Sequence, residues 1–97
     1  MNRYELMYII RPDVEDEGID ALAERVNGWV VANGGEVIDS VIWGRRKLAY
    51  PVRKQLEGTY MLHRFQMPPQ GINELERNLR LSEEILRHIV VREDEKH

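Results

Sequence analysis

The order in which strand-like and helix-like segments follow one another constrains the fold of this chain more than any other feature. Residues 3–10 alternate between two faces, as a strand does, and one of the faces is apolar or aromatic throughout. That face consists of Tyr4, Leu6, Tyr8 and Ile10. Apolar residues then recur at three- and four-residue steps from Ile19 to Trp29, and Gly34-Gly35 follow them, which predicts a helix that ends near residue 33.

The middle of the chain reads as two further strands. Residues 36–43 are rich in β-branched and aromatic types, and Gly44 is expected to interrupt this strand before residues 48–50 resume an extended path. Glu57-Gly58 is the expected tip of a hairpin. Residues 59–67 alternate again and are predicted to form the third strand.

The last third of the chain predicts one more helix and one more strand. Pro68-Pro69 ends the third strand and can begin a helix, because proline is tolerated in a first turn. The apolar stripe of this helix consists of Ile72, Leu75 and Leu79. Residues 85–92 are the expected fourth strand, and residues 92–97 are expected to fray.

The resulting β-α-β-β-α-β order is that of the split βαβ, or ferredoxin-like, α+β fold. Two right-handed crossovers place the four strands in one antiparallel sheet, with both helices on one face and the other face open. We expect the first and third strands at the centre and the second and fourth at the edges. Since no linker or repeat interrupts the 97 residues, we expect residues 1–97 to form a single domain.

The chain offers little for catalysis. It has no cysteine, which excludes disulfides, thiolate metal sites and cysteine nucleophiles. His63 and His88 lie in strand patterns, where a partly buried imidazole with a hydrogen-bond partner is the ordinary interpretation. Neither Ser40 nor Ser82 lies in a nucleophile elbow, and no metal-ligand spacing is present. We therefore predict no enzyme, no catalytic residue, no metal, no cofactor and no small-molecule substrate.

Hydropathy argues against a membrane protein. The longest apolar runs are the five residues 6–10 and the four residues 29–32, whereas a bilayer-spanning helix needs roughly 20. The first residues enter a strand pattern directly, without the apolar region of a signal peptide. We expect a cytoplasmic protein with no membrane partner.

The net charge of −3 conceals a local excess of positive charge. Five basic residues fall within ten positions that contain no acid, and the rest of the chain carries nine basic and seventeen acidic residues, a net charge of −8. The five are Arg45, Arg46, Lys47, Arg53 and Lys54. A basic segment on an acidic body predicts oriented contact with an anion, although such a run can also be an ordinary solvated loop.

The residue types in this segment favour RNA as the anion. Arginine guanidiniums make bidentate contacts with phosphate and stack on bases, and Lys47 adds a point charge. Tyr50 lies within the run and offers an aromatic ring to an unstacked base or sugar.

With these motifs the chain resembles the bacterial small-subunit ribosomal protein S6 family. The resemblance spans nearly the whole chain, and the central basic run is its most specific part. It rests on Arg3-Tyr4-Glu5, Gly44-Arg45-Arg46-Lys47-Leu48-Ala49-Tyr50-Pro51-Val52-Arg53-Lys54, Glu57-Gly58-Thr59-Tyr60, Phe65-Gln66-Met67-Pro68, Leu79-Arg80-Leu81 and Val90-Val91-Arg92. The resemblance implies a structural component of the small ribosomal subunit. Such a component pairs with small-subunit ribosomal protein eighteen and binds the central domain of small-subunit ribosomal RNA.

The resemblance also implies which residues contact RNA. Tyr4 shares a face with Leu6 and is expected in the core, whereas Arg3 lies on the opposite face, where it can reach phosphate. The implied RNA contacts are Arg3, Arg45, Arg46, Lys47, Tyr50, Arg53 and Lys54, with Arg87 and Arg92 as further candidates on the last strand.

The partner protein is expected on the open face of the sheet or at its edge. The acidic remainder of the chain favours a basic partner, and apolar residues on that face lack cover. The residues concerned are Met7, Ile9, Tyr60 and Leu62. Alternatively, Tyr60 and Leu62 pack under a loop.

Two other functions are compatible with this topology, because the fold alone does not define a function. One is a ferredoxin-like module that binds or responds to a small ligand, which would need an occupied pocket. The other is a protein-only scaffold, whose binding would depend little on salt. An RNA-recognition motif is disfavoured, because the third strand lacks the aromatic signature of that domain.

Overall fold

The computed structural model describes residues 1–93, and the remaining tail, residues 94–97, lies outside the described part. The expected fraying therefore falls largely on residues that are not described, while Arg92 is the last residue of a strand. None of the helices within residues 1–93 is long and apolar enough to cross a membrane. In chain order the elements are β1 (Asn2–Ile10), α1 (Asp16–Ala32), β2 (Glu36–Val52), β3 (Gln55–Met67), the short helix η1 (Pro69–Gly71), α2 (Ile72–Leu81) and β4 (Ile85–Arg92).

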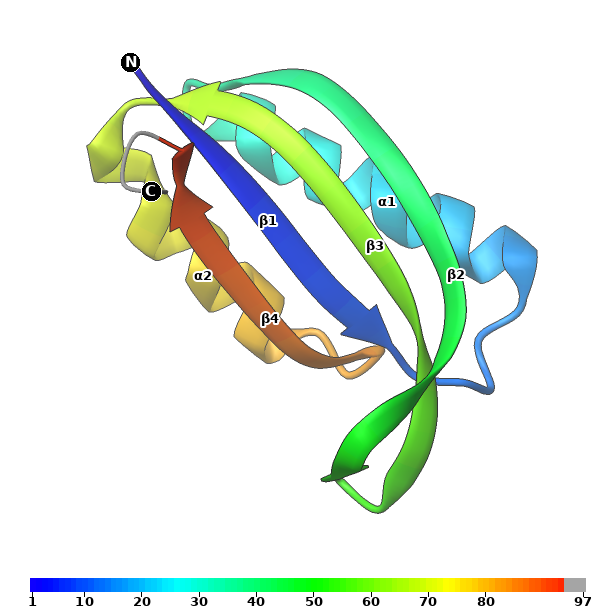
Figure 1. Cartoon of the computed structure of the whole chain (residues 1–97). Helices are drawn as coiled ribbons and strands as arrows, with labels where there is room; N and C mark the ends of the chain where they lie inside the picture. Colours follow the sequence, from blue (N-terminus) through cyan, green and yellow to red (C-terminus); the bar gives the residue numbers. More distant parts are fainter. Residues whose placement is uncertain (94–97) are drawn as a thin grey trace.

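The sheet has the predicted ferredoxin-like topology. Its four strands run in the order β2-β3-β1-β4, and every neighbouring pair is antiparallel. This order confirms β1 and β3 as the central strands and β2 and β4 as the edges. Figure 1 shows α1 and α2 side by side behind the sheet, so one face is covered and the other is open.

The core lies between the sheet and the two helices. Tyr4 is buried on this covered face, as predicted, and its ring stacks on Phe65 with the ring centroids 5.5 Å apart. The predicted helix stripes point into the same layer. The buried residues of this core layer include Leu6, Tyr8, Ile10, Ile19, Leu22, Val26, Val30, Leu75 and Leu79.

A buried polar cluster crosses this core from β3 to α1. His63 has no exposed surface, and both ring nitrogens have partners: Nε2 lies 2.9 Å from the Tyr8 hydroxyl and Nδ1 lies 2.9 Å from Asn27 Oδ1. With Asn27 Oδ1 as acceptor, Nδ1 donates and Nε2 accepts from Tyr8. Burial lowers the pKa of His63 from 6.5 to about 4 and raises the pKa of Tyr8 above its ordinary value. His63 is therefore neutral and structural near neutral pH.

The hairpin between β2 and β3 differs from the prediction. Gly44 does not end β2; it adopts a φ of +91° at a register shift, and the strand continues to Val52. The tip lies at Arg53-Lys54 (φ 49° and 68°), the positive values that a two-residue primed turn requires, so the expected tip at Glu57-Gly58 is wrong. We call residues 45–58 the arm. It projects beyond the ends of β1 and β4 and curls under them (Figure 1).

Gly58 does not form a turn; it allows two strands of the sheet, β3 and β1, to approach each other closely. It pairs with Arg46 in the arm. A Cβ at position 58 would collide with the Ile9 side chain and would lie 2.8 Å from the Ile10 carbonyl oxygen. Since real Cβ atoms do not approach backbone oxygen so closely, the absence of a side chain lets β3 cross the end of β1.

Candidate nucleic-acid interface

The basic run forms the two-stranded arm, not a loop, and its cations differ in availability. Arg45 is held by the body of the protein: Nη2 donates to the Pro12 carbonyl oxygen at 2.6 Å, and Nη1 lies 3.2 Å from Glu57 Oε1. Within residues 1–93, Arg45 is the one arm cation that pairs with a carboxylate. Of the predicted contacts in the arm, it is the one most satisfied by its own chain.

The other arm cations face solvent. Arg46 makes one hydrogen bond, from Nη2 to the Trp43 carbonyl oxygen at 3.3 Å, which leaves most of its donors unused. The side chains of Lys47 and Lys54 are exposed and make no hydrogen bond or ion pair to another described residue. The arm therefore presents positive charge that the chain itself does not neutralise.

Two contacts join the arm to β4. The Arg87 guanidinium hydrogen-bonds the Tyr50 hydroxyl, and its carbon lies 5.9 Å from the centroid of the Tyr50 ring. At the tip, Arg53 Nη1 donates to the Ile85 carbonyl oxygen at 3.5 Å. The structure thus brings Tyr50, Arg53 and Arg87 together, although 37 residues separate Tyr50 from Arg87.

The remaining predicted contacts lie at the far end of the sheet. Arg3 is six residues from Ile9, which pairs with Arg87, so it is about 20 Å from the arm end of the sheet. Arg92 pairs with Tyr4, beside Arg3, but projects from the covered face, whereas Arg3 projects from the open one. The predicted residues therefore form an arm group and a separate pair, not one continuous patch.

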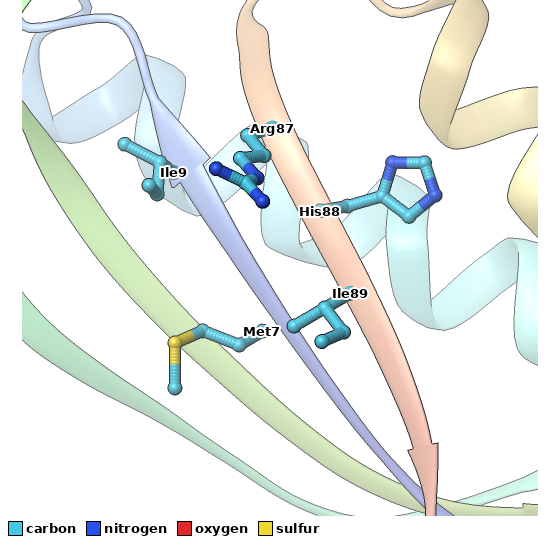
Figure 2. Close-up of a pocket in the computed structure, with 5 residues that line it drawn as sticks. All are labelled: Met7, Ile9, Arg87, His88 and Ile89. Atoms are coloured by element: carbon cyan, nitrogen blue, oxygen red, sulfur yellow. The ribbon is translucent and has the colours of Figure 1, made fainter. Parts of the chain in front are cut away.

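The open face of the sheet carries a second candidate surface. The four predicted partner-binding residues lie on it as two cross-strand pairs, Met7 with Leu62 and Ile9 with Tyr60. A cavity of about 280 Å³ is lined by Met7, Ile9, Arg87, His88 and Ile89. In Figure 2 the His88 ring points away from the other four side chains. His88 Nε2 instead lies 3.5 Å from Glu76 on α2.

Neighbouring side chains on the same face bury Leu62. A groove of about 350 Å³ runs along Met7 and Leu62, and the charged pair Glu5 and Arg64 also lines it. Its other apolar lining residues are Trp43, Ile89 and Val91, which the sequence prediction missed. Leu62 is only 7% exposed, although both helices lie on the other face of the sheet (Figure 1). Side chains of the open face, rather than a loop, therefore cover it. The alternation of β4 could have indicated Ile89 and Val91. The face of Trp43 depends on the Gly44 irregularity, which sequence patterns do not specify.

The described part of the chain, residues 1–93, contains no cluster of three metal-ligating side chains. The polar atoms of the buried His63 are satisfied by Tyr8, Asn27 and Ser40, and the cavities on the open face are mainly apolar. The described residues present two candidate binding surfaces, the cationic arm and the apolar face beside it.

A ferredoxin-like sheet with a covered face, an open apolar face and a basic arm defines a small α+β binding module. A family model described as "Ribosomal protein S6" matches residues 3–92. The chain belongs to the ribosomal protein S6 family and is a small-subunit ribosomal protein, a structural component of the ribosome.

A solved structure agrees with this assignment. The chain is similar to the crystal structure of 30S ribosomal protein S6 from Thermotoga maritima, with 35% sequence identity and a TM-score of 0.89. The match covers 94% of this chain and 86% of the other. The resemblance found in the sequence motifs is therefore confirmed at the level of both family and fold.

Proposed function

We propose that this chain binds the central domain of small-subunit ribosomal RNA together with small-subunit ribosomal protein eighteen, as a single domain within the cytoplasmic ribosome. One observation carries the RNA part: four of the five cations in the arm have no carboxylate partner within residues 1–93. They stand on an acidic body, so an approaching polyanion is attracted to the arm and repelled elsewhere. The proposed RNA contacts are those predicted above.

Protein eighteen is proposed to dock on the open face. Ile89 is 57% exposed and Trp43 is 44% exposed, and the groove they line with Met7 and Leu62 is mainly apolar. The residues outside the arm carry a net charge that favours a basic partner. This face adjoins the arm through Arg87, so RNA and protein partner can be bound side by side.

Salt-dependent binding of a central-domain RNA fragment, measured with and without protein eighteen, tests the RNA proposal. Each phosphate neutralised adds roughly −0.7 to −0.9 to the slope of log affinity against log salt. Arg46→Glu should weaken binding and flatten the slope without changing the fold, because Arg46 makes one intramolecular hydrogen bond through its side chain. Arg77→Glu, at an exposed position of α2, is the matched charge control. Equal slopes for wild type and Arg46→Glu would remove the arm from the interface.

Pairing with protein eighteen tests the docking proposal separately. Ile89→Glu should abolish pairing because it places a charge in the open-face groove, and Leu62→Glu should do the same. Val31→Glu is the control, since Val31 is 62% exposed on α1. Pairing that survives Ile89→Glu in a folded protein would overturn this docking surface.

A further inference from the structure

A basic cavity lies where the tip of the arm meets the end of α2 and the start of β4. It has a volume of about 380 Å³, and its lining includes three arginines, Arg53, Arg80 and Arg87, together with His88. The other lining residues are apolar, and none is acidic. We call it the arginine cavity. Arg80 was not among the predicted contacts, and three separate elements supply the three guanidiniums.

Two acidic residues of the same region already have partners, and one of them, Glu76, contacts His88 of the cavity lining. Glu76 lies 3.5 Å from His88 Nε2, and Glu84 pairs with Arg25 at 2.6 Å. The side chain of Arg80 is exposed and makes no hydrogen bond or ion pair to any residue in the described range. The α2 macrodipole favours a cation in the last helical turn, but it does not explain why Arg53 and Arg87 converge on the same cavity. None of the three guanidiniums forms an ion pair with a carboxylate among residues 1–93.

Two of the three guanidiniums are held in place. Arg53 bonds the Ile85 carbonyl oxygen through Nη1, and Arg87 is held by the hydroxyl and ring of Tyr50. Each contact uses one of five N–H donors, so donors remain for a ligand. Guanidiniums fixed in this way lose little side-chain entropy on binding a phosphate, which they can contact in bidentate fashion.

We propose that the arginine cavity binds a phosphodiester group of the RNA strand that passes over the arm, with Arg80 as an additional RNA contact. This inference rests on the proposed function and deepens it. An RNA strand fits better than an acidic peptide because Tyr50 lies beside the cavity, where its ring can stack on a base. A free phosphate has the same binding chemistry, and the test separates the two.

The test compares Arg80→Gln with Arg77→Gln in binding to the central-domain RNA fragment in the presence of protein eighteen. Both residues lie on α2 and are exposed, but Arg77 does not line the cavity and pairs with Glu74 at 3.9 Å. Arg80→Gln should reduce the salt slope by roughly 0.7 to 0.9, which corresponds to about sixfold weaker binding at 0.1 M salt. Arg77→Gln should match the wild type. Titration with inorganic pyrophosphate, followed by the NMR signals of the arginine Nε–H groups, forms the second arm.

The outcomes are distinct. A reduced slope for Arg80→Gln alone, with pyrophosphate perturbing Arg53, Arg80 and Arg87, supports the inference. RNA binding that is unaffected by Arg80→Gln overturns it and leaves the proposed function intact. Absence of RNA binding by the wild type overturns both, and pyrophosphate binding in that case would assign the cavity to a free phosphate.

Discussion

The strands β2 and β3 run through both the arm and the body, by which we mean the rest of the sheet with its two helices. Most side chains of β3 are buried in the body, whereas most side chains of the arm are exposed. In the body, β3 buries Phe65 and His63 completely against the helices. In the arm, Tyr50 of β2 and Leu56 of β3 are more than half exposed, and four of the five cations have no carboxylate partner within residues 1–93. The free energy of unfolding should therefore depend mainly on the body, and the proposed RNA binding should depend mainly on the arm. Substitutions in the two regions should have separable effects.

The largest expected effect is the loss of a core ring in the body. Phe65→Ala should lower the free energy of unfolding by about 3–5 kcal/mol, because it leaves a cavity beside Tyr4. Leu56→Ala removes a large apolar side chain from the arm, where it is 67% exposed, and should cost about 0.5 kcal/mol or less. Urea unfolding measures both. Similar losses for the two variants would contradict the division between body and arm.

Acid should weaken the body through His63. The pKa of this histidine is about 4 in the folded protein and 6.5 in its ordinary state, so the unfolded chain binds the extra proton first as the pH falls. The contribution is intact above pH 6.5 and is lost progressively down to pH 4, by about 3 kcal/mol in total. Unfolding measured across this range should show the loss in the wild type and a smaller pH dependence in His63→Gln. The same pH dependence in both proteins would show that His63 is not responsible.

The junction between body and arm should be sensitive at Gly58. Gly58→Ala should cost about 1–3 kcal/mol, because the new methyl group meets Ile9 and the Ile10 carbonyl oxygen and forces the strands apart. Amide chemical shifts should change at the end of β1 as well as in the arm. If only arm signals moved, the crossing would not couple the two regions.

The smallest expected effect is a gain in stability at Gly28. This residue lies in α1, and a Cβ there would have no heavy atom within 4 Å. Gly28→Ala should therefore raise the free energy of unfolding by about 0.5–1 kcal/mol through helix propensity alone. A thermal unfolding scan detects this change. A loss of stability would contradict the open space that the structure shows around position 28.

The fold could be predicted from the sequence because the spacing of apolar residues reflects which side chains are buried. The alternation of residues 3–10 and the helix stripe from Ile19 to Trp29 define faces, and the topology of split βαβ units then places β1 and β3 at the centre. The hairpin tip could not be placed in this way. Glycine is the usual turn residue, but here the turn has Arg53 and Lys54 at positive φ, while Gly58 serves the crossing of β1.

The types of residue in the candidate site were predicted, but the sequence did not predict which of these residues lie close together. Arg80 lies in a motif that supported the family resemblance, yet only tertiary structure brings it to Arg53 and Arg87. Arg45 looked equivalent to Arg46, but it bonds Pro12 and Glu57 of its own chain. Contacts between elements distant in sequence decided both cases, and a linear pattern of charge does not encode them.

The length of β2 has a consequence for the free protein. A 17-residue edge strand exposes a row of unpaired backbone donors and acceptors, which can template pairing with another copy and lead to aggregation. If two copies met through their arms, arginines and lysines of like charge would come close together, which is unfavourable. The cations of the arm therefore disfavour this edge pairing between copies. In the proposed RNA complex, phosphate groups would neutralise the same cations and cover this part of the edge.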